Sequence, residues 1–589
     1  MSATQDDDEL DQRATDKLRW NGWGYEDTEF AISQSGDVYL TGQRYSSAGE
    51  LPSFRGWVET DLGIDLRVVA PSGPFPSHLP EPTKNEPWVK EAEGNYGKIS
   101  FDPAERLQHS HGHTAQEIFR LRYGWKPEYR IVDAVVYPRE HGDVEKLVAL
   151  CVKHNVVVIP YGGGTSVTYG LSPPDGERRM IISMDMSLMN KVKWVNKKNM
   201  TACIEAGLRG ILLAEKLEEY GVTMGHEPDS AEFSTFGGWI ATRASGMKKN
   251  RYGNIEDLLV NAKLVTPIGV IHKEAPVPRV SCGPDINQII LGSEGTLGVI
   301  TEGIVKIRPL PEHRIFGAIV FPRFEDGVKF MREVAYHRAQ PASLRLVDNE
   351  QFRFSQALKP KSTAYFQSIA DLLKKKYITQ WHGFDVNQMA AATLVFEGTK
   401  EEVSSQQKIV YAIAKRYNGV KADAKNGKRG YELTFMIAYL RDFAFQVGMI
   451  SESFETSVPW SNTYALCQRV KERVRAASRL LKVPGEPFTS CRVTQAYDVG
   501  SCVYFYIALQ FQGLDDPVHV FSEIEHAARD EIFKAGGSIS HHHGVGKHRI
   551  SFVKQAIGET GISTLQTLKN GIDPKNIFAN GNLIDPTSK

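Results

Sequence analysis

Apolar residues follow two periods along the chain, and these periods predict its elements. Residues 131–137 are a β-branched run, and after Asp143 the apolar positions recur every three or four residues. Residues 156–159 form a short, wholly apolar run of the kind that is buried on both faces of a sheet. The pattern predicts a strand, a helix capped by Asp143 and a second strand, joined as a βαβ unit.

Similar patterns continue along the chain and indicate an α+β fold. We divide the chain into an N-terminal extension (1–100), which has an acidic tail and then an aromatic-rich segment, a first domain (101–308), a second domain (309–560) and a C-terminal segment that returns to the first domain (561–589). Strands are expected over residues 180–184, 201–205, 258–267, 297–307 and 316–321, and helices over residues 211–220, 403–416, 524–534 and from 563 onward.

The composition limits the classes of protein to which the chain can belong. It has 589 residues, and its 70 Lys and Arg side chains balance its 70 Asp and Glu side chains, which argues against a nucleic-acid binder. No run reaches the ~18 apolar residues that a membrane span needs. Residues 1–13 are acidic and polar, so we expect a solvated tail there. The six cysteines form no CxxC pair, as expected for reduced thiols inside a cell.

Three loops rich in glycine and hydroxyl groups carry the first chemical signal. The first loop follows the apolar run at 156–159 directly. Its consecutive glycines allow the backbone to approach a pyrophosphate and to point several N–H groups at it. It does not open a helix with GxGxxG, so it is not the Rossmann fingerprint. The loop consists of Pro160, Tyr161, Gly162, Gly163, Gly164, Thr165 and Ser166.

The second and third loops repeat this composition further along the chain. Taken alone, each loop has a plain structural explanation: a tight turn, a helix start that needs Ser and Thr caps, or a hairpin. Their order and spacing together indicate a ligand. The second loop contributes Asp229, Ser230, Ala231, Glu232, Phe233, Ser234, Thr235, Thr242, Arg243, Ala244 and Ser245, and the third contributes Glu294, Gly295, Thr296, Leu297, Gly298, Val299 and Ile300.

This series of loops resembles the FAD-binding domain of the vanillyl-alcohol-oxidase (PCMH) type. The resemblance covers about residues 131–308, and the run DPKNIFANGNLI is similar to the closing segment of that superfamily. It implies that the three loops wrap FAD in the first domain and that the second domain, 309–560, is a cap for the substrate.

The later motifs separate two members of this superfamily. Flavin-dependent 2-hydroxy-acid dehydrogenases share the first and third loops but typically carry GDGNLH where this chain reads YDVGSCVYFY. The runs NGWGYED, SLRLVDN, TSCRVTQAYD and SHHHGVGK instead resemble the alkylglycerone-phosphate synthase (alkyl-dihydroxyacetonephosphate synthase) family, over nearly the whole chain from Trp20. The dehydrogenase is the alternative, and a catalytically dead flavoprotein scaffold is a third possibility.

The resemblance implies a transferase of ether lipid synthesis. Members of that family replace the acyl chain of 1-acyl-dihydroxyacetone phosphate with a long-chain fatty alcohol and release a fatty acid, through an adduct on flavin N5 and without net redox. The resemblance also implies non-covalent FAD, a peroxisomal location, a peripheral membrane contact and a homodimer. The chain given ends in Ser588-Lys589, one residue short of the peroxisomal signal Ser-Lys-Leu.

The same resemblance assigns roles to individual residues. A guanidinium offers a fork of donors to a phosphate, and His can give a proton to a departing carboxylate near neutral pH. A tyrosine can act as a base only if nearby cations lower its pKa, which we expect of the surrounding arginines and histidines. The implied acid/base is Tyr504, the implied phosphate and substrate contact is Arg441, and the other residues needed for activity are Arg345, His541, His542 and His543.

Each of these residues also has a structural alternative. Tyr504 and Tyr506 alternate with apolar residues, as on one face of a strand. Three successive His residues fit a surface run or a metal site, but no second cluster supplies ligands at the usual spacing, so we expect no metal. Consecutive His residues on a strand also face opposite ways, so all three can meet one ligand only from a loop. Arg345 could form only an ion pair with Asp348.

Overall fold

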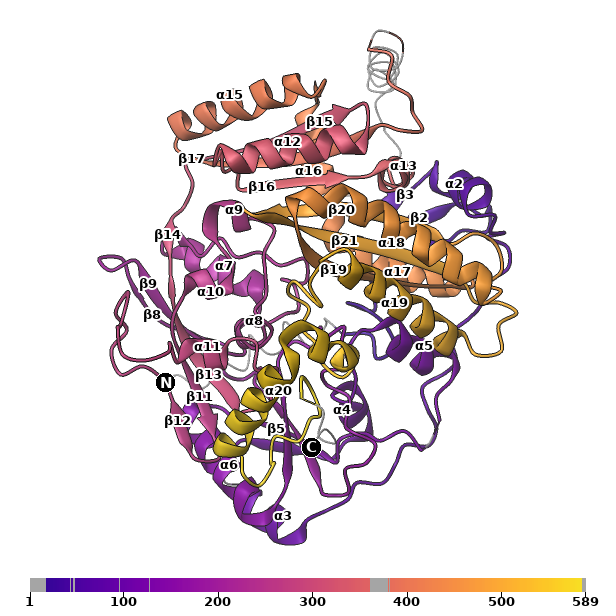
Figure 1. Ribbon diagram of the computed structural model, residues 1–589. Coiled ribbons are helices and arrows are strands. Elements are labelled where there is room, and N and C mark those ends of the chain that lie inside the picture. Colours follow the sequence, from indigo (N-terminus) through magenta and orange to yellow (C-terminus); the bar gives the residue numbers. More distant parts are fainter. Residues whose placement is uncertain are drawn as a thin grey trace.

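The fold is described from a computed structural model that covers residues 17–584, apart from residues 43, 46–47, 95, 127, 361–379 and 381. The acidic tail of residues 1–13 and the C-terminal residues 586–589 therefore lie outside the described residues. The described chain combines sheets with helices, which confirms the α+β class (Figure 1). No helix within this part of the chain is both long enough and apolar enough to cross a bilayer.

A four-stranded sheet, as far as the described residues show, is built around the predicted βαβ unit in the lower part of Figure 1. β5, β7 and β6 run parallel, and β4 pairs antiparallel with β5 at the edge. α6 (His141–His154) joins β5 to β6 as the apolar spacing predicted. The strands are, in order across the sheet, β4 (Lys98–Ser100), β5 (Ala134–Tyr137), β7 (Ile181–Asp185) and β6 (Val157–Tyr161).

The predicted cap of α6 was wrong. The helix begins at His141, and its N-cap is Glu140, whose backbone is extended. Asp143 lies instead in the first turn, where its carboxylate accepts the N–H of Arg139. An acidic side chain in a first turn satisfies free N–H groups and the helix dipole as a cap would, so the sequence signal was displaced by one turn.

Beside this sheet lies an antiparallel sheet of five described strands. The predicted strand over residues 201–205 has the predicted bounds, and the neighbouring predictions are off by one or two residues at their ends. The strands are, in order, β12 (Gly269–Ile271), β11 (Leu259–Thr266), β13 (Val299–Lys306), β9 (Thr201–Glu205) and β8 (Val192–Asn196).

A larger antiparallel sheet, with seven strands in the described chain, forms the upper part of Figure 1. Leu344 and Leu346 point to the helix-covered face, where the sheet packs against α12, α15, α18 and α19 in one apolar cluster, and Arg345 between them therefore points to the opposite face. The strands are, in order, β18 (Val420–Ala422), β15 (His313–Phe321), β17 (Ala390–Gly398), β16 (Ser343–Val347), β20 (Phe488–Ala496), β21 (Gly500–Gln510) and β19 (Met449–Pro459).

The helices on that sheet follow the predicted amphipathic segments. The helix predicted at 403–416 begins one turn earlier, at a capping box formed by Thr399 and Glu402. The helix predicted at 524–534 begins at Pro517, because Asp516 caps it. The four covering helices are α12 (Phe324–Tyr336), α15 (Lys400–Arg416), α18 (Trp460–Leu480) and α19 (Pro517–Lys534).

The aromatic N-terminal segment packs against α17 (Ile437–Gln446), a helix on the open face of the large sheet. Trp23 and Tyr25 are buried there, and Gly24 between them has φ +75°. A Cβ on Gly24 would lie 2.0 Å from Tyr439 Oη, so only glycine leaves room for that side chain. These aromatic side chains therefore pack around a glycine turn. The segment also contains β1 (Phe30–Ile32), β2 (Val38–Leu40), β3 (Gly49–Glu50) and α2 (Phe54–Asp61).

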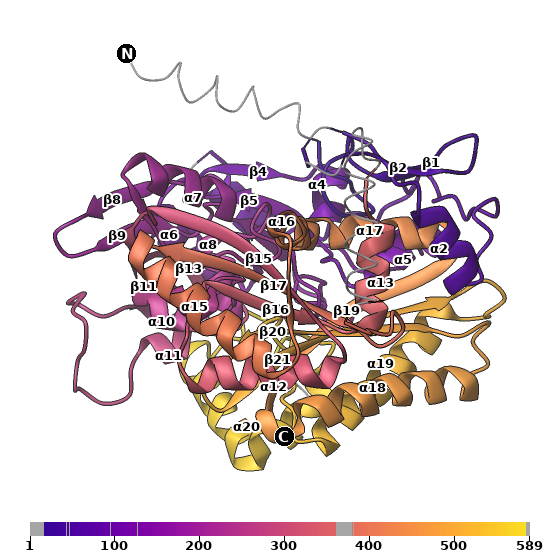
Figure 2. The same ribbon diagram turned by 90° about the horizontal axis from the view of Figure 1, so that it is seen from above.

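The C-terminal part returns to the lower sheets. α20 (Val553–Ile572) is kinked at Gly558, and the helix predicted from residue 563 is its second half. In the segment that follows, the carbonyl of Ile577 accepts a hydrogen bond from the N–H of Val158 on β6, at 2.9 Å. In Figure 2, seen from above, the yellow helix α20 and the C-terminus lie at the lower edge of the view.

The remaining elements connect these layers. They are α3 (Glu86–Ala92), α4 (Pro103–Gln108), α5 (Ala115–Tyr123), α7 (Gly210–Glu219), β10 (Val222–Thr223), α8 (Phe236–Thr242), α9 (Lys249–Tyr252), α10 (Ile255–Leu258), α11 (Asn287–Ile290), β14 (Arg308–Pro309), α13 (Asn349–Ala357), α16 (Ala424–Glu432), η2 (Leu433–Met436) and η3 (Ile550–Phe552).

Candidate active site

A cavity of about 400 Å³ brings the two halves of the chain together. One side is lined by the three glycine-rich loops, and the other by α17 and the strands β19, β20 and β21 of the large sheet. Of the predicted loop residues, those that line the cavity are Pro160, Tyr161, Gly162, Gly163, Gly164, Thr165, Ser166, Asp229, Ser230, Ser234, Thr235, Thr242, Ala244, Glu294, Gly295, Gly298, Val299 and Ile300.

The other predicted loop residues hold the loops in place instead of lining the cavity. Glu232 accepts a hydrogen bond from Tyr45, and Arg243 donates to Gln288. Ser245 donates to Asn254. The remaining residues of this group are Ala231, Phe233, Thr296 and Leu297, all of them buried.

The glycines of the first loop are required because the loops pack backbone to backbone. A Cβ on Gly163 would lie 1.9 Å from the carbonyl oxygen of Phe233, and a Cβ on Gly162 would lie 2.5 Å from Thr235 Oγ1. Several residues of the cavity wall also have a buried polar atom without a hydrogen-bond partner among the described residues, and Ser293 Oγ and His113 Nδ1 are two of these atoms. A polar ligand is what such a wall requires, so the residues fit FAD.

Tyr504 presents its phenol to the cavity from β21, beside two of the three predicted histidines. Its Oη lies 2.6 Å from His542 Nε2 and 3.2 Å from His543 Nε2. His541 points elsewhere, and its Nε2 lies 2.6 Å from Tyr497 Oη. The histidines belong to a loop between α19 and η3, and not to a strand. Consecutive residues of a loop can point the same way, and here His542 and His543 both contact Tyr504. The structural alternative, that Tyr504 lies on one face of a strand, is also confirmed, because Tyr504 belongs to β21. The two interpretations agree because that face of the strand borders the cavity.

The ionisation expected of this group was wrong. Burial raises the pKa of Tyr504 well above its usual value, and the nearby Arg492 does not reverse the shift. Burial lowers the pKa of His541 and His542 to about 3 and that of His543 to about 4, so all three are neutral at pH 7. Tyr504 therefore keeps its proton at rest, and it can act as a base only by passing that proton to a partner.

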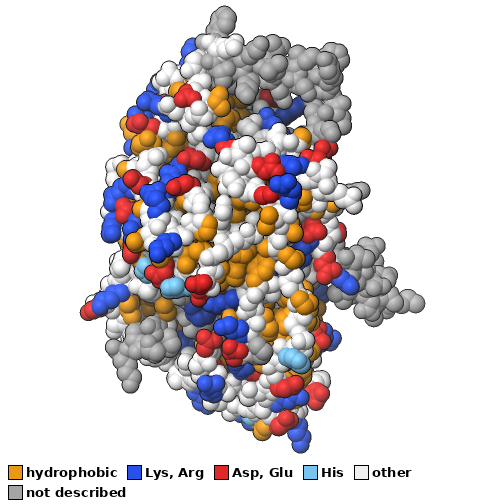
Figure 3. All heavy atoms as spheres, turned by 90° about the vertical axis from the view of Figure 1, so that its right-hand side faces the viewer, with side chains coloured by type: hydrophobic (Ala, Val, Ile, Leu, Met, Phe, Trp, Pro, Cys, Tyr) orange, Lys and Arg blue, Asp and Glu red, His pale blue; other side chains and the backbone are white. Residues whose placement is uncertain are grey.

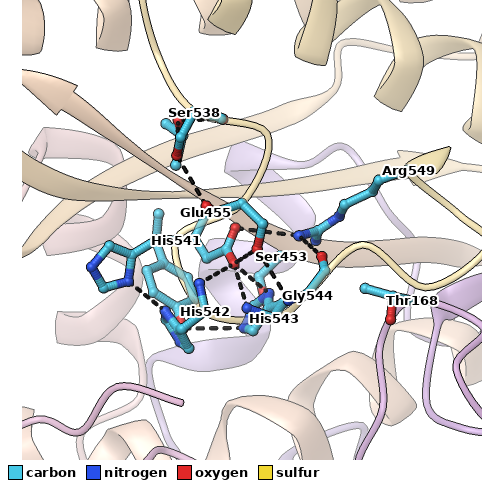
Figure 4. Close-up of polar contacts among 12 residues, drawn as sticks. Thr168, Ser453, Glu455, Ser538, His541, His542, His543, Gly544 and Arg549 are labelled. Atoms are coloured by element: carbon cyan, nitrogen blue, oxygen red, sulfur yellow. Dashed lines mark hydrogen bonds and ion pairs between the residues drawn. The ribbon is translucent and has the colours of Figure 1, made fainter. Parts of the chain in front are cut away.

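A fully buried carboxylate, Glu455 on β19, holds the histidine loop (Figure 4). It accepts hydrogen bonds from the backbone N–H of His542 at 3.0 Å and of His543 at 2.7 Å, and from Ser540 Oγ at 2.7 Å. Burial opposes its ionisation, but His543 and Arg549 hold its pKa well below the usual range. Glu455 is therefore a fixed negative charge beneath the histidines.

Two arginines of the large sheet meet one acid of the second flavin loop. Asp229 Oδ2 lies 2.7 Å from an Nη of Arg492 and 3.4 Å from an Nη of Arg345. The guanidinium of Arg492 also lies 4.8 Å from the ring centre of Tyr504, its neighbour across β20 and β21. Burial opposes ionisation of Asp229, but the two arginines keep its pKa low. The cluster joins the two domains beside the cavity.

The ion pair considered for Arg345 and Asp348 does not form. Arg345 points toward the cavity side and also donates to Thr434, whereas Asp348 caps α13 and pairs with Lys471 at 2.8 Å. The two side chains point in different directions because Arg345 lies within β16, whereas Asp348 comes just after that strand, where the chain turns into α13.

Arg441 lines the cavity from α17, as expected of a substrate contact. Its guanidinium is bound through two nitrogens to Asp442, at 2.8 and 3.2 Å, and donates to the carbonyl of His113. Asp442 also accepts from Arg122, at 3.3 Å between the charged atoms. Arg441 is thus held in one orientation with part of its charge balanced.

Sequence reasoning missed several residues of this site. Arg492 and Tyr497 lie in the run TSCRVTQAYD but were given no role, and Glu455 lies outside every quoted run. Only the pairing of β21 with β20 and β19 places Arg492 and Glu455 directly opposite Tyr504. The sequence also indicated no cluster that could add a metal ligand to the histidine run, yet Cys502, His541 and His542 place ligand atoms within 4.8 Å of one another. Cys502 lies two residues before Tyr504 on the same strand face, a proximity that spacing alone could not reveal.

The comparisons with known proteins agree with this geometry. The model of an FAD binding domain matches residues 132–274, and that of the C-terminal domain of FAD linked oxidases matches residues 310–583. An alkyldihydroxyacetonephosphate synthase of Caenorhabditis elegans is 48% identical over 96% of this chain and 95% of its own. The synthase of Dictyostelium discoideum is 33% identical over 97% of this chain and 94% of its own.

Solved structures give the same result. A crystallised alkyldihydroxyacetonephosphate synthase matches with a TM-score of 0.82 at 31% identity, covering 95% of this chain and 98% of its own. A p-cresol methylhydroxylase matches at 15% identity with a TM-score of 0.66, which bears out the vanillyl-alcohol-oxidase type of fold. A mitochondrial D-lactate dehydrogenase of Arabidopsis thaliana is 28% identical over 77% of this chain. With near full-length identity to the synthases, this FAD protein belongs to the alkyldihydroxyacetonephosphate synthase family.

Proposed function

We propose that this enzyme replaces the acyl chain of 1-acyl-dihydroxyacetone phosphate with a long-chain fatty alcohol and releases a fatty acid. The observation that carries the proposal is the contact of Tyr504 with His542 and His543 at a cavity lined by the flavin loops. Near full-length identity to the synthases supports it. FAD, when bound, supplies an electron-accepting ring that can assist exchange at the substrate carbon without net oxidation.

The acid/base step uses Tyr504, His543 and Glu455. As Tyr504 Oη takes a proton from the substrate carbon, its own proton passes to His543 Nε2. The imidazolium that forms lies with its Nδ1 3.6 Å from Glu455 Oε1, so a fixed carboxylate stabilises the new charge. The proton returns by the same route when the alcohol has replaced the acid, so the site ends in its starting state.

Arginines on two sides of the cavity bind the anionic parts of the substrate. Arg441 on α17 presents a guanidinium already oriented by Asp442, and it contacts the phosphate. Arg345 does not itself line the cavity, but it is buried beside Asp229, which does, and its positive charge favours the carboxylate that departs. Both side chains are held by acids, so little conformational entropy is lost when the substrate binds.

The cavity continues into an apolar region that suits a long hydrocarbon chain. Its walls come from the N-terminal segment, α13, α17 and the ends of β19 and β20. A small 2-hydroxy acid, the substrate class of the alternative dehydrogenase, has no long hydrocarbon chain that could contact these apolar walls. Their residues include Phe54, Trp57, Val58, Leu62, Ile64, Phe354, Phe443, Val447 and Phe488.

A lipid substrate also favours contact with a membrane surface. Three exposed hydrophobic residues follow α2, which itself lines the cavity: Val68 (50% exposed), Val69 (53%) and Phe75 (40%). Hydrophobic side chains gather in the middle of the face drawn in Figure 3. The proposal includes peripheral membrane binding, a homodimer and a peroxisomal location. Sedimentation with liposomes, light scattering and imaging of the natural full-length chain test these points one by one.

Turnover with radiolabelled hexadecanol tests the function. The purified protein, given an acyl-dihydroxyacetone phosphate, should transfer the label to the phosphorylated product and release one fatty acid for each label. Anaerobic bleaching of the flavin by a 2-hydroxy acid, without label transfer, would establish the dehydrogenase instead. A protein that retains FAD but does neither would be a scaffold.

A further inference from the structure

A continuous series of hydrogen bonds runs from the flavin-binding domain to Tyr504, and the reaction proposed above uses only its last members. It crosses between the domains through β20 and the segment between α8 and α10. Its members, in order, are Gly246, Gln495, Ser245, Asn254, Tyr497, His541, His542, Tyr504 and His543.

The first members fix the direction in which hydrogens are donated. The carbonyl of Gly246 can only accept, so Gln495 Nε2, 3.4 Å away, is the donor side of that amide. The same nitrogen donates to Ser245 Oγ at 3.0 Å, and the serine hydroxyl therefore donates to Asn254 Oδ1 at 2.6 Å. Asn254 Nδ2 must be the donor side, and it faces Tyr497 Oη at 3.1 Å.

The direction then passes through two neutral imidazoles. Because the oxygen of Tyr497 accepts from Asn254, its single hydrogen goes to His541 Nε2, 2.6 Å away. A neutral imidazole carries one N–H, so the hydrogen of His541 is on Nδ1, which donates to His542 Nδ1 at 2.7 Å. The hydrogen of His542 is therefore on Nε2, and it donates to Tyr504 Oη at 2.6 Å.

The far end of the series agrees with this direction. His543 Nδ1 lies 3.6 Å from the ionised carboxylate of Glu455, which is beyond hydrogen-bond distance, but the negative charge favours the tautomer with the hydrogen on Nδ1 and leaves Nε2 free to accept. That nitrogen lies 3.2 Å from Tyr504 Oη. Tyr504 consequently accepts from His542 and donates to His543. The hydrogen bonds that begin at Gly246 set this direction, and the charge of Glu455 favours it at the other end.

We propose that Asn254 and Tyr497 are positioning residues that hold His541 and His542 in single tautomers, so that Tyr504 gives its proton to His543 and not to His542. The consequence for the reaction rests on the proposed function. With the opposite tautomers, Tyr504 would donate to His542, whose other nitrogen faces a histidine and no carboxylate. Charge formed there would lack the direct partner that Glu455 offers to His543.

The tautomers can be measured directly in the FAD-bound enzyme by long-range ¹H–¹⁵N spectra after labelling with ¹⁵N-histidine. Substitution of His541 or His542 by Gln assigns their signals by loss. We expect His541 protonated at Nδ1 and His542 protonated at Nε2. An unprotonated Nε2 on His542 in the wild-type enzyme would overturn the proposal.

Asn254→Asp should reverse the direction in which hydrogens are donated along the series, and it hardly changes the shape of the side chain. At pH 8 the new carboxylate accepts the hydrogen of Tyr497, so His541 should move its hydrogen to Nε2 and His542 should move its hydrogen to Nδ1. Tyr497→Phe removes the link, and both histidines should then lose their single tautomers. Tyr506→Phe, on the same strand face but outside the series, should leave the spectrum unchanged. Unaltered tautomers in both Asn254→Asp and Tyr497→Phe would refute the role.

Turnover separates this inference from the proposed function. A histidine held in the wrong tautomer typically lowers kcat by roughly 10²–10⁴-fold, with little change in KM. We expect Asn254→Asp to show that loss together with an unchanged FAD spectrum. Reversed tautomers with full synthase activity would refute the positioning role. Absent synthase activity in the wild-type enzyme, with tautomers as described, would count against the proposed function alone.

Discussion

Replacing Tyr504 by Phe removes one oxygen from the centre of the site and leaves its packing in place. The ring keeps its contact with the guanidinium of Arg492, 4.8 Å from the ring centre. The hydrogen bonds of the hydroxyl to His542 and His543 are lost, and the buried N–H of His542 is left without a partner. Such a loss costs about 1–3 kcal/mol of unfolding free energy, so the variant should remain folded.

The effect on the reaction should be much larger than the effect on stability. Without the phenol no group passes a proton between the substrate carbon and His543, and loss of a general acid/base lowers the rate by roughly 10²–10⁴-fold. Label transfer from radiolabelled hexadecanol measures the rate, and the visible spectrum of FAD together with urea unfolding reports the fold.

Tyr506→Phe is the matched control for this experiment. Tyr506 lies two residues further on the same strand face, and its ring stacks with that of Tyr504 at 6.2 Å between centroids. We expect this variant to retain most activity. If Tyr506 proved essential and Tyr504 dispensable, the acid/base would have to be reassigned to Tyr506. Full activity in both variants would refute a tyrosine mechanism.

Four further predictions follow from the site. Arg441→Lys keeps the charge but loses the two-nitrogen contact with Asp442, so kcat/KM should fall by an amount equivalent to roughly 2–5 kcal/mol of transition-state stabilisation, while FAD absorbance is unchanged. Normal kinetics would show that this residue does not belong to the site. Acid precipitation should release the FAD, and a yellow pellet would show covalent attachment. Glu455→Gln should cost about 3–5 kcal/mol of stability in urea unfolding, because it breaks a buried pair with Arg549; a change below the experimental error would contradict the anchoring role. The histidines at 541–543 have pKa values of about 3, 3 and 4 in the fold, below ~6.5 in the unfolded chain. The unfolded chain therefore binds more protons, and the unfolding free energy should fall as the pH is lowered from about 6.5 towards 4; a flat profile there would argue against buried neutral histidines.

The flavin domain was largely determined by local sequence. The apolar run before residue 160 fixes a buried strand, and the glycines that follow are required because a Cβ at Gly163 would strike the Phe233 carbonyl. The strand at 201–205 was predicted with its bounds because both its apolar pattern and its flanking residues are local properties. The α6 cap was mispredicted at Asp143, since an acidic residue in the first turn and a cap give the same local signal.

The catalytic group could be named from motifs, but its ionisation and partners could not. Whether cations or burial control the pKa of Tyr504 depends on how much protein surrounds the phenol, and burial prevails. Asp229, predicted among flavin contacts, also joins two arginines of the large sheet, because the domains close over one cavity.

Strands, glycine loops and the residue types that the chemistry requires depend mainly on neighbours along the chain, so most of them could be predicted from local patterns. Which charges balance depends on the fold, as when antiparallel pairing places Glu455 and Arg492 on either side of Tyr504. The same holds for the direction of the hydrogen bonds that reach His542 from Asn254. Burial and hydrogen bonding act through space, between residues that are not neighbours in the chain.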